Sequence, residues 1–291
     1  RKLTLAMRRR TNGRWIAGLH PHDQPGWVFD LDDCPITDER VLATWAEVRA
    51  AAALLPQDAP KLRGAVRLLG DGASFVLEGG RRWPRANDFL ARVPSLRALW
   101  WVPDGGARRL VADRREAPEP GASFVQVNPA MAERLAAHVV ARVRAHAPET
   151  VVDAYAGAGD VAVTLAEGGV RVTAIELDAE ASAWSASRLP AGSRALAGRA
   201  EELLPSALPA DVVIINPPRA GVDERVTATL AAAVADGGAR PRAVVYVSCN
   251  PATLARDVAR LAGWRVASVE AFDMFPQTAH VETVCELVPE G

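Results

Sequence analysis

Apolar and polar residues alternate along the first part of the chain as they do in short strands, and one alanine-rich stretch has the character of a helix. This pattern predicts the following elements: strands over 3–7, 14–18, 62–69, 74–77 and 98–102, and a helix over 39–55. Loops rich in proline and glycine separate them. We therefore expect a smaller α+β domain over residues 1–116, followed by a linker at residues 117–122.

The pattern changes from residue 123, where short apolar strands begin to alternate with helices. The predicted helices cover 129–146, 160–167, 179–189, 223–235 and 251–262. The predicted strands cover 150–154, 170–176, 195–197, 212–215, 243–247, 265–272 and 281–287. This alternation indicates a doubly wound α/β domain over residues 123–291, closed by an antiparallel hairpin, with ligands bound at the carboxyl ends of its strands.

The net charge of −1 hides an asymmetry between the two parts of the chain. Residues 1–110 carry 18 Lys and Arg against 12 Asp and Glu, whereas the remainder carries 16 against 23. Six of the eight tryptophans also fall in the basic part. Basic charge with interleaved aromatic rings suits a nucleic-acid surface, because arginines bind phosphates and rings stack on bases. The tryptophans could equally belong to the core, and composition leaves both interpretations open.

The three cysteines, Cys34, Cys249 and Cys285, are too few and too scattered for a disulfide framework. This favours a reducing compartment, and we expect a cytoplasmic protein. No apolar run approaches the roughly 18–20 residues of a membrane span, and no signal-peptide pattern opens the chain. The sequence begins with Arg1 rather than Met, which is consistent with a missing N-terminal segment.

Cys249 is the cysteine whose position suggests chemistry. It follows the predicted buried strand 243–247, and Asn250 and Pro251 suit the cap and the first position of the next helix. Unpaired N–H groups at a helix N-terminus favour negative charge, so this setting favours the thiolate form of the cysteine. Most free cysteines are nonetheless small buried hydrophobic residues, and the position alone does not decide between the two roles.

A glycine turn follows the first strand of the α/β domain. Asp153-Ala-Tyr-Ala-Gly-Ala-Gly-Asp160 leads from that strand into a helix, and Glu176 ends the next strand. The third glycine of the dinucleotide fingerprint is absent, and the acid is placed to accept hydrogen bonds from ribose hydroxyls. These features fit S-adenosylmethionine better than NAD, because S-adenosylmethionine has no pyrophosphate to bind.

Two further segments carry polar residues at strand ends. Prolines in Ile215-Asn-Pro-Pro-Arg-Ala-Gly221 indicate a rigid loop in which Asn216 is available to bind a planar base or cofactor. Arg219 in the same loop is more typical of a surface or phosphate-binding arginine. Near the C-terminus, Glu282 begins the last predicted strand, just after His280.

Together these motifs resemble the RNA uracil-5 methyltransferase family, which makes 5-methyluridine in transfer and ribosomal RNA. The segments that carry the resemblance are Phe124-Val-Gln-Val-Asn128, Asp153–Asp160, Glu176, Asn216–Gly221, Ser248–Asp257 and His280-Val-Glu-Thr283. They span the second domain in the family's order, and the cysteine and Glu282 segments are the most specific. The first domain matches more faintly, mostly through Asp33-Cys-Pro-Ile36.

The resemblance implies a Rossmann-like class I methyltransferase domain that uses S-adenosylmethionine. Carbon 5 of uracil is too electron-poor to attack a sulfonium methyl, and a thiolate that adds at carbon 6 activates it. The family's pattern makes Cys249 that nucleophile and Glu282 the base that removes the carbon 5 proton. The implied cofactor-binding residues are Gln126, Tyr155, Gly157, Gly159, Asp160, Glu176 and Asn216. Arg219 and Asn250 are the candidate substrate-binding residues, and the basic first domain would hold the flanking RNA.

This sequence departs from the family's pattern at several positions. Asn216 stands where the family usually has Asp, Asp160 replaces a commoner Asn, and Arg199 falls where a polar cofactor contact would be expected. Cys34 resembles the last of four iron–sulfur ligands found in some members, whose three partners would precede residue 1. Since Cys34 and Cys285 cannot assemble a four-thiolate cluster alone, we expect no iron–sulfur cluster and no other metal here.

Two alternatives to uracil-5 methylation remain open at this point. Asn216-Pro-Pro-Arg219 superficially resembles the Asn-Pro-Pro-Tyr loop of enzymes that methylate an exocyclic nitrogen, although the aromatic residue is absent. The departures at Asn216 and Arg199 also suit a non-catalytic RNA-binding protein of the same fold. In each case we expect a monomer that binds RNA and no membrane, and the sequence does not identify the RNA or the uridine.

Overall fold

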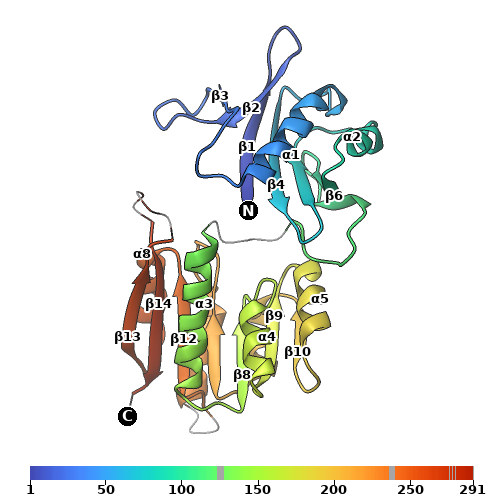
Figure 1. Ribbon diagram of the computed structural model, residues 1–291. Coiled ribbons are helices and arrows are strands. Elements are labelled where there is room, and N and C mark those ends of the chain that lie inside the picture. The colour runs from blue at the N-terminus through green and yellow to red at the C-terminus, as the bar shows by residue number, and fades with distance from the viewer. Residues whose placement is uncertain (123–127, 236–239, 275, 277, 279, 291) are drawn as a thin grey trace. The chain divides into compact units, whose positions relative to one another are not determined.

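The computed structural model describes residues 1–122, 128–235, 240–274, 276, 278 and 280–290. The chain forms two compact units, Arg1–Val125 and Gln126–Gly291 (Figure 1). Each unit is built on a seven-stranded sheet and has its own hydrophobic core. The domain boundaries predicted from the sequence, with a linker at 117–122, stay a prediction. Within the first unit, the carbonyl of Gly121 accepts a hydrogen bond of 2.7 Å from Ser74 Oγ.

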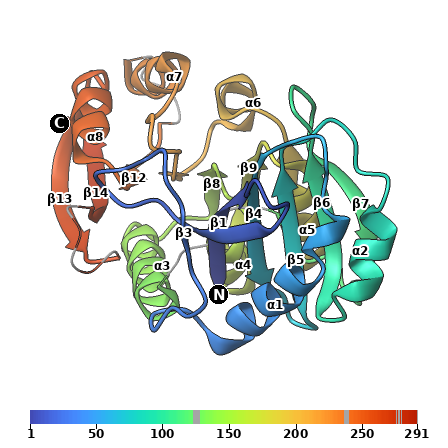
Figure 2. The same cartoon turned by 90° about the horizontal axis from the view of Figure 1, so that it is seen from above.

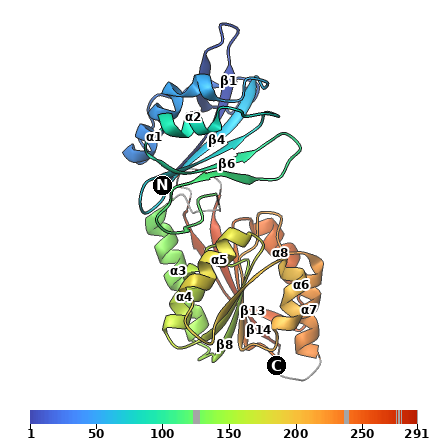
Figure 3. The ribbon, with the colours of Figure 1, turned by 90° about the vertical axis from the view of Figure 1, so that its right-hand side faces the viewer.

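The first unit is an α+β structure whose sheet has the order β3-β2-β1-β4-β5-β6-β7. Only β5 and β6 pair in parallel, and every other neighbouring pair is antiparallel. Its elements are β1 (Lys2–Arg9), β2 (Trp15–Leu19), β3 (Phe29–Asp30), α1 (Glu39–Ala50), the short 3₁₀ helix η1 (Ala52–Leu54), β4 (Lys61–Leu68), β5 (Ala73–Glu78), α2 (Ala86–Arg92), β6 (Leu96–Val102) and β7 (Arg109–Asp113). Both α1 and α2 contribute to one core on one side of this sheet (Figure 3).

Most tryptophans of the first unit belong to its core. Trp45, Trp83, Trp100 and Trp101 are at most 8% exposed, whereas Trp27 is 54% exposed. Composition left open whether the tryptophans belong to the core or to a nucleic-acid surface, and these four rings belong to the core. Rings of this size supply much of the apolar area that a domain of this length must bury. Trp27 is left as the exposed ring.

The second unit is a doubly wound α/β structure, as the sequence predicts. Its sheet has the order β10-β9-β8-β11-β12-β14-β13, parallel as far as β12 and closed by an antiparallel β13–β14 hairpin. The strands are β8 (Thr150–Ala154), β9 (Arg171–Glu176), β10 (Arg194–Ala197), β11 (Val212–Ile215), β12 (Ala243–Ser248), β13 (Trp264–Phe272) and β14 (Glu282–Pro289). The helices are α3 (Pro129–Arg144), α4 (Asp160–Glu167), α5 (Ala179–Arg188), α6 (Ala200–Ala207), α7 (Glu224–Ala235) and α8 (Pro251–Ala259).

The central strands β8, β11 and β12 of this sheet are buried on both faces. Residues of β12 alternate between two cores: Val245 packs with α3 and α4, and Val244 with α6, α7 and α8. The two helical layers are visible on opposite sides of the strands in Figure 2. A strand covered on both faces reads as a continuous apolar run, which explains the near absence of polar residues from β11 and β12.

The structure contains four strands and α-helices that the sequence pattern did not predict, namely the two-residue strand β3, α2, α6 and β7. The helix α6 includes Pro205, which disfavours a helix prediction although the proline lies near the helix end. The strand β7 is a short edge strand without a buried residue, so it lacks an alternating apolar signal. The predicted helix over 39–55 is also wrong at its end, because α1 stops at Ala50 and a 3₁₀ turn follows.

In the described part of the chain, no helix combines the length and the apolar character needed to cross a bilayer.

Candidate active site

The candidate residues of the second unit cluster at the carboxyl ends of its parallel strands. Cys249 and Asn216 follow the last residues of β12 and β11, and Glu176 is the last residue of β9. Neighbouring parallel strands bring these ends to one edge of the sheet, where doubly wound proteins bind ligands. The topology therefore assembles at one edge residues that are more than 70 positions apart in sequence.

The loop that carries Cys249 is fixed on both sides by hydrogen bonds. Ser248 Oγ accepts from the Asn250 N–H (3.2 Å) and donates to the Asn250 carbonyl (3.1 Å). Asn250 caps α8, its side chain accepting from the N–H groups of Ala252 (3.0 Å) and Thr253 (3.5 Å), with Pro251 at the first helical position. The predicted cap is confirmed, and Cys249 lies partly exposed between the strand and this helix.

The register between β12 and β14 relates Cys249 to Glu282. Val247 pairs with Val284 and Ser248 with Thr283 in the antiparallel ladder. The ladder ends at this pair, with Cys249 directly after β12 and Glu282 as the first residue of β14. Glu282 is only 4% exposed, and the same residue pairs with Phe272 on β13. Cys249 and Glu282, the two catalytic candidates from the sequence, thus lie at neighbouring strand ends.

The glycine turn after β8 has the backbone that its sequence requires. Gly157 and Gly159 have φ values of 58° and 81°, which only glycine adopts without strain. A Cβ at Gly159 would lie 2.1 Å from Ser185 Oγ on α5, so this glycine also permits close packing of two helices. At Gly157 a Cβ would meet nothing within 4 Å, which leaves that side of the turn open.

Glu176 ties the glycine turn to the end of β9. One carboxylate oxygen accepts from the Gly157 N–H and the other from the Asp178 N–H, both at 2.8 Å. Each carboxylate oxygen has a second lone pair, so these bonds leave acceptor capacity for a ligand. The sequence placed Glu176 near the turn but did not show that its carboxylate braces the turn itself.

Tyr155 has an unusual backbone at this edge. Its φ is 62°, a conformation that is uncommon for a bulky residue and that recurs at functional sites. Burial raises the pKa of Tyr155 to about 12, with the charge of Glu201 adding to the effect, so its hydroxyl keeps its proton near neutral pH. Asp160 opens α4 with an exposed side chain, which forms an ion pair of 2.9 Å with Arg188.

The loop 216–221 continues the strand edge before it turns. The Asn216 N–H donates to the Ala154 carbonyl (3.2 Å), and the Asn216 side chain is exposed. Arg219 is exposed as well, and its carbonyl accepts from Thr253 Oγ1 on α8 (3.4 Å). This last bond connects the loop after β11 to the helix that follows Cys249.

Asp257 is a structural residue of the site that the sequence reasoning did not single out. It is fully buried, and one carboxylate oxygen accepts from Tyr246 Oη (2.8 Å) and from the Val222 N–H (3.0 Å). The other oxygen accepts from Arg256 Nε (2.9 Å). A Cβ at Gly221, where φ is 79°, would lie 2.3 Å from this carboxylate. Asp257 therefore joins β12, α8 and the 216–221 loop.

The sequence contained one signal for this role. Asp257 lies three residues after the buried Leu254 and four before the buried Leu261, so it interrupts the apolar face of α8. A carboxylate on the buried face of a helix is costly unless it is paired and hydrogen-bonded.

Some predicted site residues are not part of this description. Gln126 lies outside the described residues. Cys34 is a free, partly buried cysteine of the first unit. Over the residues that the structure describes, no group of three or more His, Cys, Asp or Glu side chains could hold a metal ion.

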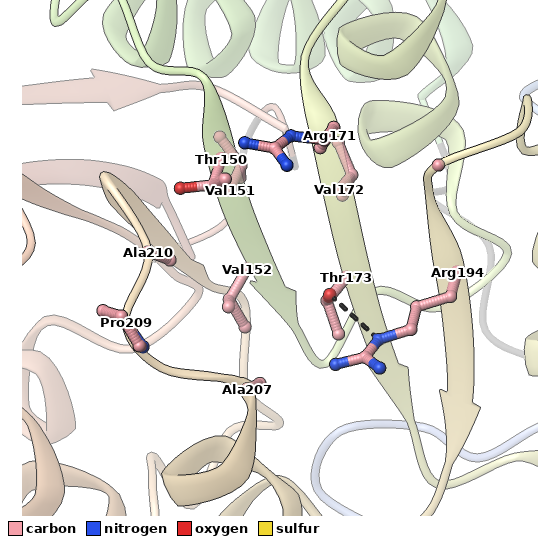
Figure 4. A pocket seen from close by; sticks show the side chains of 11 residues that line it. Thr150, Val151, Val152, Arg171, Val172, Thr173, Arg194, Ala207, Pro209 and Ala210 are labelled. Atoms are coloured by element: carbon pink, nitrogen blue, oxygen red, sulfur yellow. Dashed lines mark hydrogen bonds between the residues drawn. The ribbon is translucent and has the colours of Figure 1, made fainter.

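A hollow of about 280 Å³ in the second unit lies at the opposite edge of the sheet from these residues. Figure 4 shows its lining, which includes Thr150 and Arg171 at the starts of β8 and β9. There Arg194 Nε donates to Thr173 Oγ1 at 3.3 Å. Since it opens at the amino ends of the strands, this hollow does not belong to the carboxyl-end site.

Comparison with known proteins identifies similar sequences over both units. Residues 197–288 match the family model described as tRNA (uracil-5-)-methyltransferase, a range that includes Cys249 and Glu282. An uncharacterized RNA methyltransferase of Gloeobacter violaceus is 42% identical over 326 residues, which cover 98% of this chain and 69% of that protein. An uncharacterized RNA methyltransferase of Halalkalibacterium halodurans is 38% identical over 325 residues, which cover 94% of this chain and 68% of that protein.

Other relatives match a smaller part of the chain. The 23S rRNA (uracil(747)-C(5))-methyltransferase of Shewanella amazonensis is 35% identical over 182 residues, covering 58% of this chain and 44% of that protein. An uncharacterized RNA methyltransferase of Listeria monocytogenes is 39% identical over 177 residues. The chain spans only 36–44% of the length of several curated relatives that it matches.

Among solved structures, the fold is similar to that of the Pyrococcus abyssi tRNA (uracil-54, C5)-methyltransferase in complex with S-adenosyl-L-homocysteine. The TM-score is 0.70 at 23% sequence identity, with 98% of this chain and 75% of that chain covered. This likeness confirms the class I methyltransferase fold that the sequence predicts.

Proposed function

The chain belongs to the RNA uracil-5 methyltransferase family, and we propose that it methylates carbon 5 of a uridine in RNA with S-adenosylmethionine as the methyl donor. The chain's fold is that of a tRNA uracil methyltransferase solved with S-adenosyl-L-homocysteine, the demethylated product of this donor. The RNA and the uridine that this chain modifies are not part of the proposal.

The residues at the glycine turn fit this cofactor. The backbone at Gly157 is open on the side where a Cβ would stand, so a ligand can approach it closely. Glu176 is held beside the turn and retains lone pairs for ribose hydroxyls. Tyr155, Gly159, Asp160 and Asn216 border the same strand ends, and we assign them to the cofactor site together with Gln126. When bound, S-adenosylmethionine supplies a methyl group on a positively charged sulfur.

In the proposed mechanism Cys249 opens the reaction. Its sulfur forms a bond to carbon 6 of uracil. The electron pair of the carbon 5–carbon 6 double bond moves to carbon 5 and the adjacent carbonyl, forming an enolate whose carbon 5 is nucleophilic. Once carbon 5 carries both its proton and the new methyl group, the carboxylate of Glu282 removes the proton. The double bond then re-forms, the carbon–sulfur bond breaks and the thiolate of Cys249 is released.

One observation supports this assignment most directly, namely the pairing of Ser248 with Thr283. Cys249 follows Ser248 and Glu282 precedes Thr283, so both candidates adjoin the last pair of this ladder. A nucleophile for carbon 6 and a base for the proton on carbon 5 must reach adjacent atoms of one ring, and residues beside one strand pair suit that requirement. Asn250 follows Cys249, the Arg219 carbonyl accepts a hydrogen bond from α8, and we propose that both residues contact the nucleotide.

The test uses RNA that contains 5-fluorouridine. Fluorine on carbon 5 cannot be removed as a proton, so the covalent protein–RNA adduct persists after methyl transfer and is detected by mass spectrometry. We expect the adduct with the unchanged protein and with Cys34→Ala, and none with Cys249→Ala. An adduct in Cys249→Ala would contradict the assignment. Nucleoside analysis of ordinary product RNA separates 5-methyluridine from a nucleoside methylated on an exocyclic nitrogen.

A further inference from the structure

The first unit has a sheet face that carries a marked excess of positive charge. Leu5 and Met7 of β1 are buried in the core with the helices, so the alternate residues of the strand, such as Arg8, point to the other face. The register places residues of β4 on that same face. The cationic side chains there are Lys2, Arg8, Lys61, Arg63 and Arg67.

Few carboxylates balance these cations. Arg63 is bonded to Glu78 on β5 at 3.1 Å, and Arg67 pairs with Glu119 at 3.6 Å. Burial lowers the pKa of Lys2, and the charges of Arg67 and Arg63 lower it further, which is the sign of crowded like charges.

Arg8 is the cation whose binding capacity is least used. Its Nε is buried and has no hydrogen-bond partner, and its Nη1 donates only to the Met7 carbonyl at 3.3 Å. Among the described residues, no carboxylate lies within ion-pair distance of Arg8. A buried guanidinium nitrogen without a partner is costly, and an anionic ligand would relieve that cost.

This face is also hollowed beside Arg8. A cavity of about 310 Å³ opens there, with Thr4, Ala6 and Gly18 among its small lining residues and Arg8, Arg63 and His20 around them. The small side chains give a phosphate or a sugar room to approach the guanidinium.

An exposed aromatic residue contacts the lining of the hollow through its backbone, at His20. Trp27, in the loop between β2 and β3, is 54% exposed, and its carbonyl lies 2.8 Å from Nδ1 of His20. Leu19, which also lines the hollow, is 38% exposed. Most other large rings of this unit are core residues, so the exposed ring of Trp27, on a residue that contacts His20 of the hollow, is available to stack on a base.

We propose that this face, defined by Lys2, Arg8, Lys61, the hollow and Trp27, binds a single-stranded segment of RNA. Arg8 and the two lysines contact backbone phosphates, and one base stacks on Trp27. That the ligand is RNA rests on the proposed function. The proposal adds a surface of the first unit that holds the RNA outside the catalytic unit. Binding at this face does not depend on which uridine is modified.

The experiment measures binding of a fluorescently labelled 12-nucleotide oligouridylate to the full chain at several salt concentrations. We expect Trp27→Ala to weaken binding about 5- to 100-fold and Trp27→Phe, which keeps a ring, to restore most of it. Arg8→Ala should reduce the slope of log K against log [salt] by about 0.7, the value for one lost phosphate contact on a single strand. Lys61→Ala, at an exposed position, should behave in the same way.

The matched control is Arg92→Ala, which removes an exposed arginine from α2 on the opposite side of the sheet. It should leave both the affinity and the salt slope unchanged. Circular dichroism establishes whether each variant is folded. If Arg8→Ala is not folded, Lys61→Ala alone tests the loss of one positive charge from this face. Unchanged binding in Trp27→Ala and Lys61→Ala would overturn the proposal, as would an equal loss in Arg92→Ala.

The readouts keep this proposal separate from the proposed function. Adduct formation by Cys249 with 5-fluorouridine RNA reports the chemistry, whereas the oligonucleotide titration reports the surface. If the adduct forms and the surface variants bind RNA normally, the surface is wrong and the function stands. If no adduct forms but the surface variants lose affinity, the protein binds RNA here without the proposed chemistry.

Discussion

Ser248 and Thr283, 35 residues apart in sequence, are paired at the ends of β12 and β14. Cys249 and Glu282 adjoin this last pair of the ladder, so the proposed nucleophile and base depend on one antiparallel register. A slip of this register by one residue would turn the Glu282 side chain to the other face of the sheet.

The first prediction concerns the base. In Glu282→Gln the amide cannot accept the carbon 5 proton, so the covalent adduct should accumulate with ordinary uridine RNA while turnover falls by about 10²–10⁴. Denaturing electrophoresis of protein and labelled RNA measures the adduct, and 5-methyluridine analysis measures turnover. Glu270→Gln, on the exposed part of β13, is the control and should keep normal turnover. Full turnover by Glu282→Gln would show that another group removes the proton.

The second prediction tests the glycine turn. Gly159 and Gly169 have φ values of 81° and 91°, so an alanine at either position bears a similar left-handed backbone cost of about 1–2 kcal/mol. At Gly159 the new Cβ would also lie 2.1 Å from Ser185 Oγ, whereas at Gly169 it meets nothing within 4 Å. We therefore expect Gly159→Ala to lower the free energy of unfolding more than Gly169→Ala does. Urea denaturation measures both, and equal losses would mean that the contact with α5 relaxes without cost.

The third prediction concerns the Asp257 carboxylate, which joins three segments of the site. Removing the hydroxyl that donates to it, in Tyr246→Phe, should lower the free energy of unfolding by about 1.5–3 kcal/mol, because the acceptor is charged. Asp257→Asn should cost more, since it also removes the partner of Arg256. Urea denaturation of the two single variants and the double variant measures the coupling. Strictly additive losses would indicate that the two side chains act independently.

The fourth prediction is a pH dependence of stability. Burial raises the pKa of Asp153 from an ordinary 3.8 to about 7, and the charges of Glu176 and Asp160 add to this. Between these two pH values the folded protein holds a proton that the unfolded chain has lost. The contribution of this group is therefore fully present below about pH 4 and is lost as the pH rises through 7.

Asp153→Asn removes this titration without changing the size of the side chain. We expect the variant to be more stable than the unchanged protein at pH 8, by at least about 1 kcal/mol, and to lose less stability between pH 5 and pH 8. Urea denaturation across that range measures the difference. The control, Asp88→Asn, changes an exposed carboxylate of α2 and should leave the pH profile as it was. Parallel profiles for Asp153→Asn and the unchanged protein would refute the prediction.

Local sequence determined much of the second unit. Strands buried on both faces read as apolar runs, and helices between them have their own start signals, as Asn250 and Pro251 show for α8. The order of candidate residues along the chain was therefore enough to place them at the carboxyl ends of parallel strands. Where a local signal conflicts with the structure, as Pro205 does within α6, the element was not predicted.

Tertiary structure alone decided which residues meet. Whether Trp27 or Trp45 lies in water depends on what packs over each ring, and a tryptophan carries no local mark of its burial. The β12–β14 ladder, which ends beside Cys249 and Glu282, joins segments that are distant in sequence. The contacts of Tyr246 and Val222 with Asp257 do the same. Such contacts follow from the summed packing of the whole sheet and its helices, because no single stretch of sequence contains both partners.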